Sequence, residues 1–139
     1  MVDLLVAGCA ALFLDQWSKR IVELRAGRSV VSVGSIVRIR NTRNARDLYS
    51  NNVARAALVT IWVAALASGI MLHRAGSQFQ THAAMVGLGA ALGGAAGNLL
   101  DILRRRFIVD FIDLGWWPVF NLADVAIIAG LVLALWPSR

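Results

Sequence analysis

Four long apolar stretches are the feature of this sequence that most restricts its fold. They lie at about residues 2–19, 54–73, 82–103 and 118–136, and each approaches the roughly 20 mostly apolar residues that an α-helix needs to cross a bilayer. The chain is 58% hydrophobic, with a mean hydropathy of +0.66, which is too apolar for a soluble domain of this size. We therefore predict an all-α membrane protein in which residues 1–139 form a single integral membrane domain with four transmembrane helices.

The segment between the first two stretches is rich in β-branched residues. In SVVSVGSIVRIRN, Arg38 and Arg40 alternate with Val37 and Ile39, which is the period of a strand with one apolar face. We predict a small β element at the membrane interface between helices 1 and 2. The first stretch lacks a basic start and a cleavage site after its apolar part, so we expect a retained helix rather than a signal peptide.

The distribution of charge argues against nucleic acid as a partner. The formal net charge is +6, from 14 Lys and Arg against 8 acidic residues. Nine of the basic residues lie between Lys19 and Arg55, and a second group comprises Arg104, Arg105 and Arg106. Both groups flank apolar stretches, where attraction to anionic lipid headgroups explains them. We expect membrane lipids as partners and no nucleic acid.

The polar residues of the apolar stretches converge on one membrane face. If four helices cross in sequence, the end of the first, the start of the second, the end of the third and the start of the fourth share a face. Polar side chains concentrate at these ends and in the last connection, at Asp15, Lys19, Asn98, Asp101, Asp110, Asn121 and Asp124. Ionisable groups at the edge of a membrane helix are costly, so this convergence indicates a functional site.

The third stretch carries small residues at four-residue spacing, at Gly89, Gly93 and Gly97. In lipid this spacing lets helix backbones pack closely, and we expect it to bring helix 3 against helix 4 and Asp124. Trp116 and Trp117 directly precede the fourth stretch, which is typical of the aromatic belt at a membrane interface.

Asp110 and Asp124 are the candidate catalytic residues. Asn98 and Asp101 are three residues apart, as are Asn121 and Asp124, so both pairs can point into one cleft. Two carboxyls in a water-poor pocket do not both ionise readily, so one keeps a proton while the other stays charged. The charged member can take a proton from an attacking water, and the protonated member can donate to the oxyanion and then to the leaving amine. The pattern predicts an intramembrane aspartyl protease site without cofactor.

No metal site is expected beside these residues. Cys9 has no partner cysteine, which excludes a disulfide and a cysteine metal cluster. His73 and His82 are expected at the opposite membrane face.

The surrounding motifs resemble those of the signal peptidase II family, the lipoprotein signal peptidases. The family's GNxxD, VDF and FNxAD elements stand here as GNLLD at 97–101, VDF at 109–111 and FNLAD at 120–124. Its DQxTK element near the end of the first helix stands as DQWSK at 15–19. The resemblance covers most of the chain and extends to both residue type and spacing.

The resemblance implies a membrane aspartyl endopeptidase that removes signal peptides from lipid-modified prolipoproteins, cutting before the diacylglyceryl cysteine. The catalytic pair would be Asp110 and Asp124, and the partner would be the prolipoprotein signal peptide. The location would be the bacterial cytoplasmic (inner) membrane, multi-pass, with both termini cytoplasmic and the active site facing the outer leaflet. We expect a monomer. The positions that match residues supporting the dyad or binding substrate are Asp15, Asn41, Asn98, Asp101 and Asn121.

The sequence departs from the family pattern where the substrate would be recognised. The family's NxGxAF loop corresponds to residues 41–46, where Arg43 replaces Gly and Arg46 replaces Phe; both remain candidate substrate-binding residues. Ile102 stands where the family has Arg, and Arg106 where it has Gly. A bidentate donor is therefore missing, unless one of the next two arginines after Ile102 supplies it. These departures favour a divergent member with altered substrates or reduced sensitivity to peptide antibiotics.

Two other functions remain open from the sequence. One is a non-catalytic or altered-specificity paralogue that binds lipidated peptides, and the other is a small proton or ion carrier. A carrier typically has polar residues at the bilayer midplane and an inverted repeat, and this sequence shows neither. The sequence gives two conflicting predictions for the orientation in the membrane. Twelve Lys and Arg lie at the membrane face that carries the site, and only Arg74 and Arg139 lie at the opposite face. The positive-inside rule then predicts a cytoplasmic site, whereas the resemblance implies the reverse, which we adopt.

Overall fold

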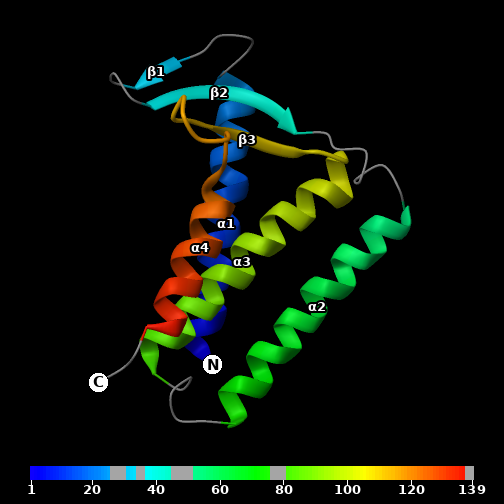
Figure 1. Ribbon diagram of the computed structural model, residues 1–139, viewed down its shortest axis with the longest axis vertical. Coiled ribbons are helices and arrows are strands. Elements are labelled where there is room, and N and C mark those ends of the chain that lie inside the picture. Colours follow the sequence, from blue (N-terminus) through cyan, green and yellow to red (C-terminus); the bar gives the residue numbers. More distant parts are fainter. Residues whose placement is uncertain (26–30, 34–36, 45–51, 76–80, 137–139) are drawn as a thin grey trace.

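The computed structural model describes residues 1–25, 31–33, 37–44, 52–75 and 81–136, which form four helices and three strands. The helices are α1 (Val2–Arg25), α2 (Asn52–Ala75), α3 (His82–Arg105) and α4 (Leu122–Leu135). The strands are β1 (Val31–Val33), β2 (Val37–Asn44) and β3 (Ile108–Asp113), in one antiparallel sheet of order β1-β2-β3. In Figure 1, α1, α3 and α4 pack together, α2 runs along the far side of α3, and the sheet lies across one end.

Two of the described helices are long and apolar enough to cross a membrane. They are Asn52–Met71 of α2, with a mean hydropathy of 1.8, and His82–Arg105, with 1.5. α4 is a shorter apolar helix of 14 residues. α1 has 24 residues, but its second half carries Asp15, Gln16 and Lys19. The fold is therefore mostly helical with two clearly apolar helices, and spanning by α1 and α4 remains a prediction.

The fourth helix begins at Leu122 rather than near residue 118, where the sequence predicted it. Phe120 instead forms an antiparallel bridge with Ile112 of β3, in which Ile112 N donates to Phe120 O at 2.8 Å. Asn121 then caps α4, because its side-chain oxygen accepts from the backbone N–H of Asp124 at 3.1 Å. Backbone pairing thus extends to the first turn of the helix, which the apolar pattern alone does not reveal.

Glycines set the distances between α3 and its two neighbours. Gly89 and Gly93 lie against the backbone of α1, where an added Cβ would collide with carbonyl oxygens, and Gly97 faces an α1 side chain. Gly87 lies against α4, where a Cβ would be 2.5 Å from the carbonyl oxygen of Gly130. The stripe of small residues at 89, 93 and 97 therefore packs helix 3 against helix 1 and not helix 4, while the predicted close contact of helix 3 with helix 4 is made through Gly87 and Gly94.

α2 is joined to the other helices by few polar contacts. Trp62 Nε1 donates to the carbonyl oxygen of Leu92 at 3.1 Å. Arg55 Nη2 donates, also at 3.1 Å, to the carbonyl oxygen of Leu103, which lies in the last turn of α3 where carbonyls lack a helical partner. Most other α2 side chains with a described exposure are exposed or half-exposed, as suits a helix that faces lipid.

The sheet packs on the end of the helices where the polar residues gather. Phe111 of β3 is buried with Val22 of α1, and Leu122 of α4 packs against them. Across the sheet, Thr42 of β2 pairs with Asp110 of β3. β1 and β2 occupy the segment in which a strand was predicted, and their position at a membrane interface stays a prediction. The sequence analysis did not predict β3, which comes from between α3 and α4.

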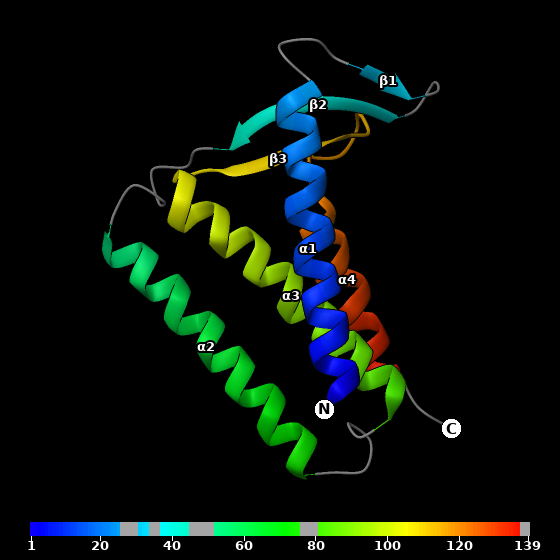
Figure 2. The ribbon, with the colours of Figure 1, turned by 180° about the vertical axis from the view of Figure 1, so that it is seen from behind.

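The start of α1 and the end of α4 lie together at the end of the molecule away from the sheet (Figures 1 and 2). There, Asp3 Oδ2 is 2.7 Å from His82 Nδ1, so the first turns of α1 and α3 are in contact. This arrangement of chain ends agrees with the alternating direction expected of successive helices.

Candidate active site

Asp110 and Asp124 are brought together by the sheet and by the cap of α4. Asp110 lies in the middle of β3 and is only 5% exposed. Asp124 is the third residue of α4 and completes a capping box with Asn121: Asp124 N donates to Asn121 Oδ1, and Asn121 N donates to Asp124 Oδ2, both at 3.1 Å. The cap therefore fixes the backbone and the side chain of Asp124 at the same time.

Two asparagine amides connect the two carboxyls. Asn121 Nδ2 donates to Asp110 Oδ1 at 2.8 Å and to Asn98 Oδ1 at 3.1 Å. Asn98 Nδ2 in turn donates to Asp124 Oδ1 at 2.9 Å. An unbroken path of hydrogen bonds thus runs from Asp110 through Asn121 and Asn98 to Asp124. Each carboxyl receives an amide N–H along this path.

A buried ion cluster lies behind the amides. Lys19 Nζ is 2.8 Å from Asp15 Oδ2 and 2.8 Å from Asp101 Oδ2, and all three side chains are fully buried. The same ammonium donates to Asn98 Oδ1 at 3.0 Å. Asp15 and Lys19, four residues apart on α1, therefore form an ion pair that is buried within the helices. Burying these charges is tolerated because they are paired and hydrogen-bonded.

Asp15 also ties α1 to the start of α4. Its Oδ1 accepts from the backbone N–H of Ala123 at 3.0 Å, one of the N–H groups that a helix start leaves without a helical partner. Gln16 Nε2 lies 3.1 Å from Asp15 Oδ2, 3.1 Å from the carbonyl oxygen of Gly97 and 3.3 Å from Asp101 Oδ1. These contacts join α1 to α3 and α4 beside the amides of Asn98 and Asn121.

The two arginines that follow Leu103 were the candidates for the donor that the family pattern has at Ile102. Arg105 reaches back to α1, where its Nη2 is 3.2 Å from Glu23 Oε2, and its Nη1 is 3.5 Å from Asp101 Oδ1. The side chain of Arg104 is exposed on the surface of α3. Arg105 is thus engaged with acidic side chains of α1 and α3, and the replacement of the missing donor by one of these two arginines stays a prediction.

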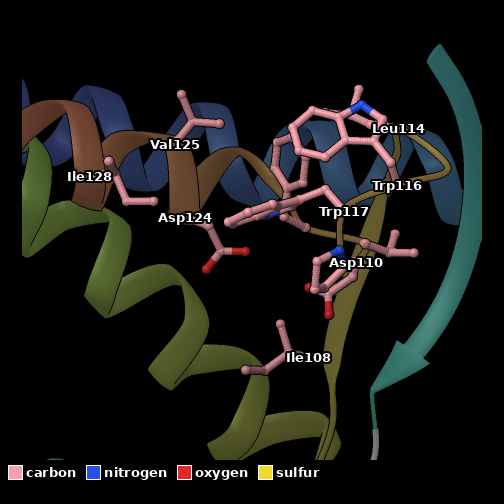
Figure 3. Close-up of a pocket in the computed structure, with 11 residues that line it drawn as sticks. Ile108, Asp110, Leu114, Trp116, Trp117, Asp124, Val125 and Ile128 are labelled. Carbon is pink, nitrogen blue, oxygen red and sulfur yellow. The ribbon is translucent and has the colours of Figure 1, made fainter. Parts of the chain in front are cut away.

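A cavity of about 620 Å³ opens beside the two carboxyls. Its walls are mostly apolar and come from β3, the connection to α4 and the first turns of α4. In Figure 3 the carboxyl groups of Asp110 and Asp124 face the same space, with Ile108 across from Asp124 and the indoles of Trp116 and Trp117 nearby. Such a space suits an apolar chain that passes two acids.

The cavity wall contains few of the predicted site residues whose side chains the structure describes. Among the described residues, only Asp110 and Asp124 of the predicted set line it. Asn41 and Arg43 belong to β2, where the backbone of Arg43 pairs with Val109. Arg46 lies outside the described residues.

The positions of Trp116 and Trp117 at the cavity and the contacts of Gln16 were not predicted from the sequence. The tryptophans were assigned to an interfacial belt, yet Trp116 and Trp117 line the cavity and pack edge to face, with ring centroids 5.7 Å apart. Their position four or five residues before Asn121 was the available signal. Gln16 sits within a matched motif, so its contact with Asp101 could have been sought from the motif itself.

Comparisons with known proteins show the family of this chain. The chain matches the family described as signal peptidase (SPase) II over residues 7–138. It belongs to the signal peptidase II family. The lipoprotein signal peptidase of Rhodococcus jostii (strain RHA1) is 35% identical over 119 residues, which cover 81% of this chain and 59% of that protein. The lipoprotein signal peptidase of Moorella thermoacetica is 34% identical over 139 residues, which cover 95% of this chain and 89% of that protein.

Other relatives match over shorter segments. The lipoprotein signal peptidase of Syntrophomonas wolfei is 62% identical over 47 residues, which cover 34% of this chain and 32% of that protein. The chain thus spans less than two thirds of the length of the Rhodococcus and Syntrophomonas relatives. Membership of the family, the bacterial relatives and the apolar helices α2 and α3 identify a bacterial membrane protein.

Solved structures share the fold. Two structures of a bacterial membrane enzyme, determined by the in meso method at 2.3 and 1.9 Å resolution, superpose with TM-scores of 0.79 and 0.83. The first covers 96% of this chain and 85% of its own at 20% identity, and the second covers 100% and 96% at 21% identity. At these identities the likeness establishes the arrangement of helices and strands.

Proposed function

We propose that this protein is a membrane aspartyl endopeptidase that removes signal peptides from lipid-modified prolipoproteins, cutting before the diacylglyceryl cysteine. The observation that carries the proposal is the path of hydrogen bonds that joins Asp110 to Asp124 beside one largely apolar cavity. Membership of the signal peptidase II family supports the same activity. Because one chain supplies both carboxyls, we propose that the protein acts as a monomer.

In this mechanism Asp124 is the charged member of the pair. Its Oδ1 accepts from Asn98 and its Oδ2 from the backbone of Asn121, and hydrogen bonds to a carboxylate favour its charged form. The N-terminus of α4 adds a favourable partial positive charge. Asp124 takes a proton from a water as the water oxygen attacks the scissile carbonyl. Asp110 donates its proton to the developing oxyanion. As the C–N bond breaks, Asp124 gives the proton that it took from the water to the leaving nitrogen, and a hydroxyl of the collapsing intermediate returns a proton to Asp110.

The cavity supports a lipidated substrate. Apart from the two acids its walls are apolar, including Val125 and Ile128 along the exposed side of α4. A signal peptide and acyl chains would move from the bilayer to such walls at little cost in free energy, because both environments are apolar. Trp116, which is 75% exposed, would rest at the membrane surface and hold the cavity mouth there.

We propose a multi-pass arrangement in which all four helices cross the cytoplasmic membrane and residues 1–139 form one domain. The sheet and the active site then face the outer leaflet, and the start of α1 and the end of α4 face the cytoplasm. A reporter fused after residue 139 tests this orientation: a cytoplasmic reporter signal is expected. An extracytoplasmic signal would instead support the orientation given by the positive-inside count.

Cleavage of a lipidated peptide by the purified protein is the direct test. We expect the parent protein to cut a diacylglyceryl-cysteine precursor peptide, and Asp110→Asn and Asp124→Asn to lose at least about 10³-fold in rate, because each removes one member of an acid–base pair. Asp113→Asn is the matched control. It is the same Asp→Asn substitution in the same strand, at a position that is also buried. In the parent, Gly115 N donates to Asp113 Oδ1 at 2.8 Å, and the side-chain oxygen of the substituted Asn can still accept this hydrogen bond.

The result also decides between this function and its main alternative. The departures from the family pattern at Arg43, Arg46 and Ile102 favour a substrate specificity that differs from that of other family members. A parent protein that binds a panel of diacylglyceryl peptides but leaves all of them uncut would identify a non-catalytic lipopeptide-binding member of the family. Equal cleavage by the parent and both Asp→Asn variants would remove the carboxyls from the mechanism.

A further inference from the structure

Lys19 occupies an unusual position for a cation. It is the sole lysine among the chain's 14 basic residues, and its side chain is fully buried in the last third of α1. Its ammonium lies within 3.0 Å of three acceptors, which are Asp15 Oδ2, Asp101 Oδ2 and Asn98 Oδ1. Three N–H groups thus meet three acceptors, two charged and one neutral. The neutral one belongs to an amide that also contacts the catalytic pair.

The contact with Lys19 decides which way the amide of Asn98 points. An ammonium donates hydrogen bonds and accepts none, whereas an asparagine side chain has one accepting and one donating end. Facing Lys19, Asn98 must present Oδ1, so Nδ2 is turned toward Asp124 Oδ1 at 2.9 Å. A flipped amide would set two donors against each other at Lys19 and two acceptors against each other at Asp124.

The cap of α4 sets the direction of the second amide, that of Asn121. Asn121 Oδ1 accepts from the backbone N–H of Asp124, which leaves its Nδ2 to donate to Asn98 Oδ1 and Asp110 Oδ1. Both carboxyls therefore receive donors because two groups that only donate, an ammonium and a backbone N–H, hold the oxygen ends of the amides.

We propose that Lys19 is a positioning residue that acts through Asn98, fixing the N–H group donated to Asp124. This inference rests on the proposed peptidase function. It differs from a purely structural role, in which Lys19 would only neutralise Asp15 and Asp101. Arg105 also lies 3.5 Å from Asp101, whereas Lys19 is the one cation paired with Asp15 among the residues that the structure describes.

The test uses a charge-balanced pair of substitutions in the full-length chain. Lys19→Met combined with Asp15→Asn removes one positive and one negative charge, and leaves Asp101 with Arg105. Asp15→Asn alone is the reference for the balanced variant, because both carry the same change at Asp15, and Arg20→Met, an exposed neighbour on the same helix, is the control. We expect the balanced variant to unfold near the parent temperature and to keep its KM. We expect its kcat to be about 10- to 100-fold below that of Asp15→Asn alone, as for the loss of a hydrogen bond to a charged group, while Arg20→Met stays within about threefold of the parent.

A double-mutant cycle with Asn98→Ala shows whether the effect passes through Asn98. If it does, the Lys19→Met exchange has little further effect on kcat once Asn98 is gone. If the effects of Lys19→Met and Asn98→Ala on kcat multiply, the proposal is overturned. A parent-like kcat in the balanced variant, or a change confined to KM, would also overturn it. In each of these outcomes a parent protein that cleaves keeps the proposed function intact.

A measurement independent of cleavage reads the amide itself. The chain has six asparagines, so ¹⁵N-asparagine labelling gives a simple spectrum in which loss of a signal in Asn98→Ala assigns the Asn98 side chain. In the balanced variant we expect this NH₂ signal to shift and its protons to exchange faster with solvent. An unchanged signal in a folded variant would show that the amide holds its direction without Lys19, and would overturn the proposal even if no substrate were cut.

Discussion

Gly97→Ala is expected to force α1 and α3 apart at the candidate active site. An added Cβ at this position would collide with Asp15 Oδ2. This oxygen has little freedom to move, because Lys19 Nζ lies 2.8 Å and Gln16 Nε2 3.1 Å from it. The other oxygen of the same carboxylate holds Ala123 N at 3.0 Å, so a displaced carboxylate would also loosen the start of α4.

The expected cost follows from opposing contributions. Replacing glycine by alanine inside a helix favours folding by about 1 kcal/mol. Overpacking costs about 1–3 kcal/mol, and losing one hydrogen bond to a charged group costs about 1.5–3 kcal/mol. We therefore expect Gly97→Ala to lower the free energy of unfolding by about 1.5–5 kcal/mol and to slow cleavage, since Asp15 and Lys19 support the amides.

Gly69→Ala is the matched control for the intrinsic helix effect. It lies in α2, and its added Cβ would be 3.7 Å from Leu92 Cδ1, an ordinary contact. Denaturant unfolding in detergent micelles, followed by circular dichroism, should show this variant equal to the parent or up to about 1 kcal/mol more stable. Equal unfolding of the Gly97 and Gly69 variants, with equal cleavage, would refute the tight contact between Gly97 and Asp15.

Two further exchanges separate backbone effects from effects on the site. Arg106 has φ of 62°, in the left-handed region, and its side chain is exposed. Arg106→Gly should therefore raise the free energy of unfolding by about 1 kcal/mol, seen as a higher melting temperature with unchanged cleavage; a lower melting temperature would contradict this. Asn121→Ser keeps an oxygen that can cap α4 but loses the N–H groups donated to Asp110 and Asn98. Cleavage should fall at least about tenfold while the helical circular dichroism signal persists, and parent-like cleavage would argue against the amide path.

Much of the site was predictable because it depends on helix direction and short spacing. Alternation of spans places the end of the first helix, the end of the third and the start of the fourth together, and Asp15, Asn98 and Asp124 are brought into one network there. The i,i+3 spacing of Asn121 and Asp124 likewise corresponds to a capping box. These features follow from helical geometry and need no knowledge of neighbouring side chains.

Other features depend on packing that the sequence does not reveal. Asn98 and Asp101 share a helical face, yet Asn98 contacts Asp124 while Asp101 lies behind it against Lys19. Asn98 and Asp101 have different partners because of how closely α1 packs against α3, and the contacts of the α3 glycines with α1 set this distance. The late start of α4 also depends on a distant partner, because Phe120 pairs with Ile112.

The departures from the family pattern have unequal consequences once they are placed in the structure. Arg106 is the C-cap of α3 and its side chain is exposed. The presence of Arg here, where the family has Gly, therefore affects mainly the backbone conformation at the helix end. Ile102 is 5% exposed and is absent from the described residues that line the cavity. Arg43 differs from both, since its backbone pairs with Val109, the residue before Asp110. A change of substrate preference in this chain is therefore to be sought along β2, beside the strand that carries Asp110, rather than at the end of α3.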